Sequence, residues 1–225
     1  MTKKILLLLI PFFFFVSFKP KEKIHTVVLN TKFGTMRILL YNETPKHRDN
    51  FLKLTNEHFY DSLLFHRVIK NFMIQGGDPD SKHAKPGAML GNGDVGYRVD
   101  AEFNPSLFHK KGVLAAARDE NPTKASSGCQ FYIVQGKTFS DADLDNLEKQ
   151  TGRKLTAEQR EIYKTIGGTP HLDMNYTVYG EVIEGMNVLD SIAAVKCDKY
   201  DRPLDDIRII SVKQAKDFKP KKVKK

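Results

Sequence analysis

The stretch FHRVIKNFMIQGGD, residues 65–78, decides how this chain is interpreted. Two short apolar runs flank the turn-like pair Lys70-Asn71, a pattern typical of a β-hairpin. A hairpin needs only its apolar residues in order to pack. This one also carries a strong base, Arg67, and an amide, Gln75. Those two polar residues therefore need an explanation beyond packing.

Length and composition favour one globular domain with a real core. The chain has 225 residues, of which 40% are apolar and 28% charged. Its formal net charge of +9 lies at the ends: residues 213–225 supply +6, Lys3 and Lys4 supply +2, and residues 19–212 carry only +1. A short lysine-rich tail usually forms a solvated end. We therefore define residues 213–225 as a basic tail and expect no nucleic acid partner.

The first eighteen residues have the pattern of a signal peptide. Two lysines precede residues 5–18, which are almost all apolar. This run matches the apolar region of a secretory signal and is short for a membrane span, which needs about 20 apolar residues. No small-x-small cleavage triplet follows it. We expect an exported protein that is either periplasmic or anchored in the membrane and facing the periplasm. Residues 1–18 are then a signal peptide or an anchor, the anchor attaching through residues 5–18. Residues 19–23 form a linker.

The cysteines and histidines indicate neither a disulfide framework nor a metal site. Cys129 and Cys197 are the two cysteines, and Cys129 sits at the start of an apolar run, which favours a free buried thiol. No CxxC, HExxH or clustered His/Asp set is present, so no metal site is predicted.

Apolar periodicity predicts a chain rich in strands. Beyond the hairpin, strands are expected at residues 24–30, 35–40, 113–116, 131–134, 177–182 and 206–212. Helices are expected at residues 45–58, with Thr44 as N-cap, and at residues 186–194. Residues 79–112 are rich in Gly, Pro, Asp and Asn and predict long loops. This pattern favours a mainly β fold, a closed barrel with helices at its ends, because closure removes exposed strand edges.

The pattern changes between two of the strands. Ser140 is a good N-cap, and Gly152 is a good stop for the helix that follows. Thr156 begins a second helix that runs to about Ile166. We predict a helical hairpin inserted at residues 137–170.

Strand alternation sorts the hairpin and a third strand into faces: Phe65 with Arg67 and Ile69, Met73 with Gln75, and Gln130 with Tyr132. If the faces that carry Arg67, Gln75 and Gln130 meet, they form an amphipathic surface with a fixed cation, two amides and an apolar wall. No nucleophile next to a base accompanies them, since Cys129 lacks an evident histidine partner.

Spacing alone leaves other interpretations open. Arg67 is equally well explained as a structural arginine that pairs with Asp78 or Glu102 and ties a loop. The pair Gly76-Gly77 is equally consistent with a bulge or a tight turn.

The quoted stretch resembles the signature of the cyclophilins, the cyclosporin-binding class of peptidyl-prolyl isomerases. Three further matches follow in the same order: GVLAAAR at 112–118, SSGCQFYI at 126–133 and HLDMNYTVYGEVIEGMNVLDSI at 171–192. Together they span nearly all of residues 24–212, which we define as the isomerase domain. A long motif with ordered companions is specific. The resemblance implies an eight-stranded antiparallel barrel capped by two helices, a monomer, and unfolded or flexible proline-containing polypeptides as substrates.

The family's reaction is rotation about the peptide bond before proline, a bond with a barrier of about 18–20 kcal/mol. No bond is broken, so the resemblance implies neither a nucleophile nor a cofactor. It implies that Arg67 and Gln75 are catalytic. It further implies an apolar pocket for the proline ring, formed by Phe72, Met73, Tyr132 and Leu172. Ala117 and Arg118 match the segment whose backbone pairs with the peptide, and Gln130 matches a polar wall residue. Tyr176 is a further substrate-binding position.

Several positions depart from the family pattern. Arg118 stands where asparagine is frequent, His171 where eukaryotic members often have tryptophan, Tyr176 where they often have histidine, and Tyr132 where phenylalanine is usual. These changes affect the expected cyclosporin affinity more than the expected activity. The alternative function is a proline-peptide binding module or chaperone on the same fold with little turnover, but the intact Arg67 and Gln75 favour the enzyme.

Overall fold

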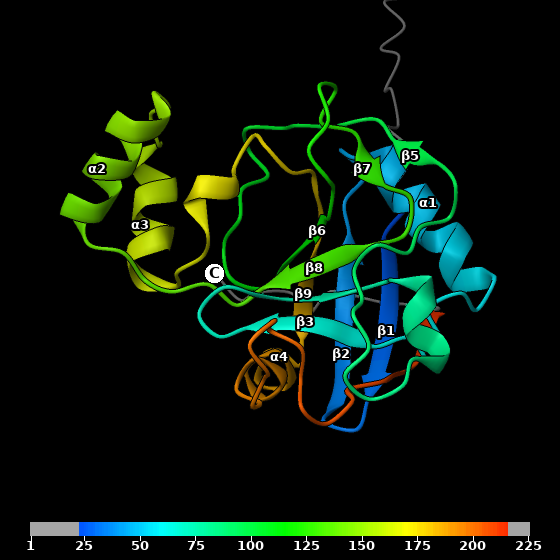
Figure 1. Cartoon of the computed structure of the whole chain (residues 1–225). Helices are drawn as coiled ribbons and strands as arrows, with labels where there is room; N and C mark the ends of the chain where they lie inside the picture. Colours follow the sequence, from blue (N-terminus) through cyan, green and yellow to red (C-terminus); the bar gives the residue numbers. More distant parts are fainter. Residues whose placement is uncertain (1–22, 216–225) are drawn as a thin grey trace, which may run out of the picture.

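Ten strands appear in the computed structural model, which describes residues 23–215 (Figure 1). Their bounds are β1 His25–Thr31, β2 Gly34–Leu40, β3 Phe65–Ile69, β4 Met73–Gly76, β5 Arg98–Val99, β6 Val113–Ala116, β7 Ser126–Ser127, β8 Phe131–Val134, β9 Val178–Glu184 and β10 Ile209–Gln214. Eight of them form one antiparallel sheet in the order β10-β1-β2-β9-β6-β8-β4-β3, and β5 pairs with β7. The fold is mainly β, as predicted.

Four α-helices accompany the sheet within the described residues. They are α1 Pro45–Asn56, α2 Asp141–Thr151, α3 Ala157–Thr165 and α4 Met186–Ala193, with short 3-10 helices at Pro79–His83 and Pro170–Leu172. The helix α1 packs against β9 and β10, and α4 against β2, β3 and β4. Figure 1 shows α2 and α3 out to one side of the sheet. Among residues 23–215 no helix is both long and apolar enough to cross a membrane.

The sheet is curled but open, so the predicted closure of the barrel is not confirmed. Its end strands are β10 and β3, which meet only where they begin, through an isolated bridge between Leu64 and Arg208 and backbone hydrogen bonds that join residues 62–65 to residues 207–209. Further along β3, the Val68 N–H donates to the carbonyl of Asp201 at 2.8 Å. A loop therefore covers the outer edge of β3 where a closing strand would lie, which protects that edge by another route.

The core divides into two clusters because β6 and β8 are covered on both faces. All four residues of each of these strands are buried. Alternate side chains, such as Leu114 and Phe131, join the large cluster that also contains residues of α1 and α4. Their neighbours in the chain, such as Ala115 and Tyr132, point to the opposite side and join a second cluster around Met73. The second cluster carries the predicted pocket residues.

The helical hairpin α2–α3 folds on local signals that are readable in the sequence. Ser140 caps α2 in a reciprocal capping box with Asp143, and Gly152 ends this helix in the left-handed conformation. Thr156 caps α3 in the same way. The hairpin has a small apolar core of its own, formed by Leu144, Leu155 and Tyr163, against which Phe108, Phe139 and Leu147 pack.

The N-terminus of α1 differs from its prediction. Thr44 is the N-cap residue, but its side chain makes no capping hydrogen bond and its buried hydroxyl has no partner. The carboxylate of Glu102 accepts instead from the N–H groups of Lys46 and His47, at 3.0 and 2.9 Å. A distant loop thus supplies the negative charge that a helix N-terminus favours.

Three predicted segments lie wholly or mostly outside the described residues: the signal peptide or anchor at residues 1–18, the linker at residues 19–23 and the basic tail. Of the tail, Lys213 and Gln214 belong to β10, where Gln214 pairs with Val27. The strand β10 therefore continues into the first residues of the predicted tail, and the N–H of Ala215 also donates to the Thr26 carbonyl at 2.8 Å.

Candidate active site

The quoted hairpin, β3 and β4, contains a bulge that changes the predicted faces. Phe65 pairs with Gly76 and Arg67 with Gln75, which are adjacent residues of β4. His66 is therefore the extra residue of a β-bulge and has no partner on β4. As a result Phe65 and Val68 both enter the large core, and simple alternation was wrong for Phe65 and Arg67. The bulge places Arg67 opposite Gln75 on the surface next to the second cluster.

Three polar side chains from neighbouring strands form a hydrogen-bonded chain. The guanidinium of Arg67 donates to Oε1 of Gln75 at 3.4 Å. Gln75 in turn donates to Oε1 of Gln130 at 3.1 Å. Gln130 is buried, and its amide donates to the carbonyls of Gly91 and Gly93, each at 2.9 Å. The chain is therefore firmly held at Gln130 and loosely held at Arg67.

Arg67 pairs with neither of the acids considered from the sequence. Its Nε lies 3.7 Å from a carboxylate oxygen of Asp201, and the two side chains are 43% and 45% exposed. Such an exposed pair contributes little free energy. Glu102 caps α1 instead, and the buried Asp78 accepts from the N–H groups of Asp80, at 2.8 Å, and Gly91. The guanidinium of Arg67 therefore remains accessible.

The pair Gly76-Gly77 ends β4 for a steric reason at its second residue. Gly77 has a φ of +95°, and a Cβ there would collide with the carbonyl oxygen of Cys129. The expectation of a turn is consistent with this close approach of two backbones. Cys129 itself is buried and unpaired, as predicted, and its burial raises the pKa of the thiol to about 11.

The predicted pocket residues lie together in the second cluster. Met73 and Tyr132 are buried in it, and Phe72, Ala117, Leu172 and Tyr176 pack against them, partly exposed. The ring of Phe72 stacks on His171 with centroids 5.7 Å apart, and Tyr132 meets Tyr176 edge to face at 5.9 Å. An apolar wall with a partly open rim thus adjoins the polar chain.

Arg118 lies at the rim and is held from two sides. Its Nε donates to the carbonyl of Asn175 at 3.0 Å, and its guanidinium lies 4.7 Å from the centre of the Tyr176 ring. The structure therefore couples two of the positions that depart from the family pattern, in a cation–π contact.

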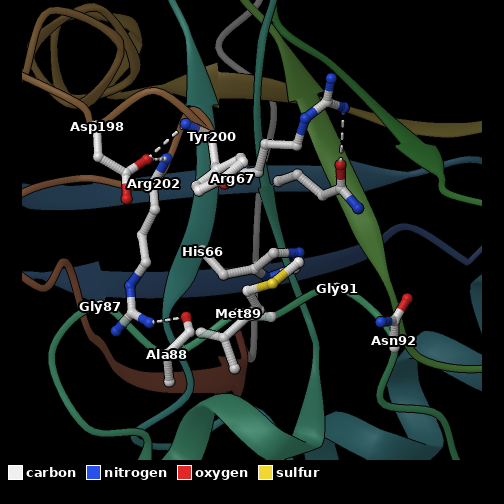
Figure 2. A pocket seen from close by; sticks show the side chains of 12 residues that line it. His66, Arg67, Gly87, Ala88, Met89, Gly91, Asn92, Asp198, Tyr200 and Arg202 are labelled. Carbon is white, nitrogen blue, oxygen red and sulfur yellow. Dashed lines mark hydrogen bonds between the residues drawn. The ribbon is translucent and has the colours of Figure 1, made fainter.

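Two hollows flank Gln75. One has a volume of about 230 Å³ and is lined by Gln75, Ala117, Arg118, Gln130 and the loop around Asp94 and Arg98. The other has a volume of about 260 Å³ and lies on the side of Arg67. Figure 2 shows the second hollow, with Arg202 on one side and His66 with Met89 on the other. Arg202 is buried, and its guanidinium donates to the Ala88 carbonyl.

His66 is a residue of this region that the sequence did not single out. It is buried, and neither ring nitrogen has a hydrogen-bond partner among the described residues. Burial lowers the pKa of His66 to about 4, so the ring is neutral at physiological pH. The bulge at His66, which depends on strand register, gives no local sequence signal.

The second loop at this hollow was also missed. Residues 198–202 bring Asp198, Tyr200 and Arg202 to the same hollow as Arg67. They come from a segment that is remote in sequence and has no periodic pattern, so only the tertiary fold places them here.

A protein-family model for cyclophilin-type peptidyl-prolyl cis-trans isomerases matches residues 26–214. The chain belongs to this family. A relative supports the assignment: a putative peptidyl-prolyl cis-trans isomerase from Staphylococcus aureus (strain COL) is 36% identical over 187 residues, which cover 83% of this chain and 89% of the relative. Peptidyl-prolyl cis-trans isomerisation is accordingly the activity of this cyclophilin-type chain.

A second relative is a larger protein. The putative bifunctional phosphatase/peptidyl-prolyl cis-trans isomerase of Streptococcus pyogenes serotype M6 is 35% identical over 189 residues, which cover 83% of this chain and 38% of the relative. The cyclophilin-type chain therefore spans well under half of that protein's length.

Solved cyclophilin-type structures share the fold. One from Cryptosporidium parvum has a TM-score of 0.64 at 24% identity and covers 87% of this chain and 99% of its own. A second, of the same protein in the presence of the dipeptide Ala-Pro, has a TM-score of 0.62 at 25% identity and covers 85% and 99%. The open, curled sheet of this chain is thus compatible with a cyclophilin-like fold.

Proposed function

We propose that this isomerase accelerates rotation about X–Pro peptide bonds by electrostatic stabilisation of the twisted amide with Arg67. As the bond twists, conjugation is lost and the proline nitrogen regains a lone pair. A guanidinium beside it donates to that nitrogen or holds the neighbouring carbonyl. Either contact strengthens in the transition state, which is the condition for catalysis.

The observation that carries this proposal is the position of Arg67 beside the apolar cluster with only weak contacts of its own. Its bond to Gln75 is 3.4 Å long, and its pair with Asp201 is exposed. Neither contact costs much to exchange for a substrate atom. Gln75, held at 3.1 Å by the buried Gln130, orients the guanidinium toward the pocket.

We further propose that the proline ring enters the apolar cluster, where Phe72, Met73, Tyr132 and Leu172 surround it. The flanking residues of an extended polypeptide then cross Gln75 toward the two hollows. Ala117 and Arg118 lie at the wall of the smaller hollow. The N–H of Ala117 already donates to the Gln130 carbonyl at 3.0 Å, and its carbonyl already accepts from Ser127 at 2.8 Å, so Ala117 contacts the peptide through its side chain.

The decisive experiment is an isomerisation assay on a short proline peptide with residues 24–215. Arg67→Ala should lower kcat/KM by about 100-fold or more, the loss expected for one transition-state donor. Arg37→Ala, which removes a surface ion pair with Glu184 on another strand, serves as the matched control. A wild-type rate equal to the uncatalysed rate would sink the enzymatic proposal.

The same variant separates catalysis from a chaperone function on this fold. If the protein also holds unfolded clients, Arg67→Ala should leave that activity unchanged while turnover is lost. Loss of both activities together, in a variant that still folds, would argue against a separate chaperone role.

We propose that the protein is exported, acting as a monomer on folding polypeptides in the periplasm or at the membrane surface facing it. The support is the basic start and the apolar run of residues 5–18. Cell fractionation with N-terminal sequencing of the mature protein tests this. A cytoplasmic protein with an intact first residue would contradict export, and an intact N-terminus in the membrane fraction would favour the anchor.

A further inference from the structure

A buried carboxylate, Asp173, lies directly after the 3-10 helix that carries His171 and Leu172. It is 4% exposed and accepts four hydrogen bonds. Two come from His109, from its backbone N–H at 2.7 Å and its ring Nδ1 at 2.9 Å. The other two come from the hydroxyl of Tyr163 at 2.7 Å and the guanidinium of Arg153 at 2.9 Å.

The insertion supplies half of this network. Tyr163 lies on α3, and Arg153 lies in the loop between α2 and α3. Arg153 also donates to the carbonyl of Pro170 at 2.8 Å. It therefore holds the 3-10 helix that bears Leu172 at both ends, at Pro170 and at Asp173. The hairpin α2–α3 is therefore connected to the segment that carries Leu172 at two places, the carbonyl of Pro170 and the carboxylate of Asp173.

The network continues from His109 into the pocket. The Nε2 atom of His109 lies 2.9 Å from the hydroxyl of Tyr132. Burial alone would raise the pKa of Asp173, but the hydrogen bonds from His109 and Tyr163 outweigh it and hold that pKa below its ordinary value. The ionised carboxylate accepts from Nδ1 of His109, which leaves Nε2 for the hydrogen bond with the Tyr132 hydroxyl.

This arrangement has a consequence for the pocket. Tyr132 is buried, and its hydroxyl forms a hydrogen bond with the fully buried His109. The surface of the ring that remains for a ligand is apolar. A phenylalanine at this position would need no such partner, whereas a tyrosine without one would leave a buried hydroxyl unsatisfied.

We propose that the hairpin α2–α3 is a positioning element for the proline pocket: Tyr163 and Arg153 hold Asp173, Asp173 orients His109, and His109 fixes Tyr132. The proposal rests on the proposed function, because it assigns the second cluster as the site where proline binds. Tyr163, Arg153, Asp173 and His109 are positioning residues, since they act on the ligand only through Tyr132 and Leu172.

The test is a double-mutant cycle on affinity for an Ala-Pro peptide, measured by titration, and on turnover. Tyr163→Phe removes one hydroxyl and keeps the ring packed between Phe108 and Phe139. It should raise Kd and KM about fivefold and leave kcat within about twofold, because the pocket wall binds ground and transition states alike. In a Tyr132→Phe background the same change should raise Kd by less than about twofold.

Two further variants complete the design. Arg153→Met should raise Kd in both backgrounds, because its bond to Pro170 holds Leu172 independently of Tyr132. Lys164→Gln, which breaks an exposed ion pair with Asp141 on the outer side of the hairpin, is the matched control and should change nothing.

The outcomes separate the two levels of the argument. Equal rises in Kd for Tyr163→Phe with and without the Tyr132 hydroxyl would overturn the relay, since a merely structural effect does not depend on that hydroxyl. Wild-type protein that binds the peptide without turnover would overturn the enzymatic proposal, while the binding cycle would still decide the relay. Wild-type protein that does not bind the peptide would overturn both.

Discussion

The polar and apolar halves of the candidate site are built in different ways. The polar half depends on exposed contacts: Arg67 is 43% exposed, and its bond to Gln75 is 3.4 Å long. The apolar half is set by burial: Met73 and Tyr132 are 2% and 4% exposed, and a buried network holds the Tyr132 hydroxyl. One half is rigid before any ligand arrives, and the other keeps its donor available.

This difference matches the demands of the proposed reaction. A pocket that binds proline in both isomers gains from being preorganised, because ordering it on binding would cost free energy. A donor that acts only in the twisted state gains from having no strong competing partner in the free protein. The comparison therefore predicts that changes in the two halves affect different measured quantities.

The largest expected effect is on the free energy of unfolding, because His66 is buried whereas its neighbour Arg67 is partly exposed. Burial lowers the pKa of His66 from 6.5 to about 4. Between these values the unfolded chain takes up a proton that the folded chain does not. The free energy of unfolding should thus fall as pH drops from 6.5 to 4, by about 3 kcal/mol in total. His66→Phe should abolish this loss in urea unfolding at pH 7 and pH 4.5.

The exposed His58 provides the control for that measurement. His58→Gln removes a surface histidine that pairs with Asp61, so the change it causes can be set against the change caused by His66→Phe. An unchanged pH dependence in His66→Phe would show that His66 finds a partner in solution, and the contrast with Arg67 would lose its basis.

The next effect is on turnover. Arg67→Lys keeps the charge but loses the planar fork that is aimed by Gln75. We expect kcat to fall about 30-fold, or ~2 kcal/mol, while the free energy of unfolding changes by less than ~0.5 kcal/mol, since the contacts of Arg67 are exposed. The assay is peptide isomerisation alongside urea unfolding. A variant with wild-type kcat would show that charge alone suffices, and the proposed role of Gln75 would fall.

The smallest expected effect is on KM and tests the apolar half of the site. Leu172→Ala removes part of a half-buried wall that binds proline in the ground state and the transition state alike. KM should rise about fivefold, or ~1 kcal/mol, with kcat unchanged. Leu204→Ala, which truncates an exposed leucine away from this cluster, is the control. A drop in kcat without a change in KM would contradict the division of labour between the halves.

Much of the local structure was predictable from the sequence. The strands β6 and β8 match their predicted bounds, since short apolar runs next to glycine- and polar-rich segments leave little ambiguity. The inserted hairpin was predictable from Ser140, Gly152 and Thr156, because capping and a left-handed glycine act within one turn. The pocket residues were predictable only through resemblance to a family, since no periodicity marks them.

Other features were not predictable for a physical reason. The bulge at His66 depends on how β3 registers against β4, and the partner of Arg67 lies in a loop far along the chain. Closure of the barrel is not confirmed, because β10 reaches only the beginning of β3 and that loop covers the edge of β3 further along.

The sequence by itself determined which segments form strands and helices and which residue types the site contains, because propensity, capping and turn chemistry are local. Only the tertiary structure decided how those residues are held. His109, Tyr132 and Asp173 meet from three separate segments, and no sequence pattern indicated that Tyr132 would be held by the other two. A buried polar group must find partners wherever the fold provides them, so such a network is a property of packing.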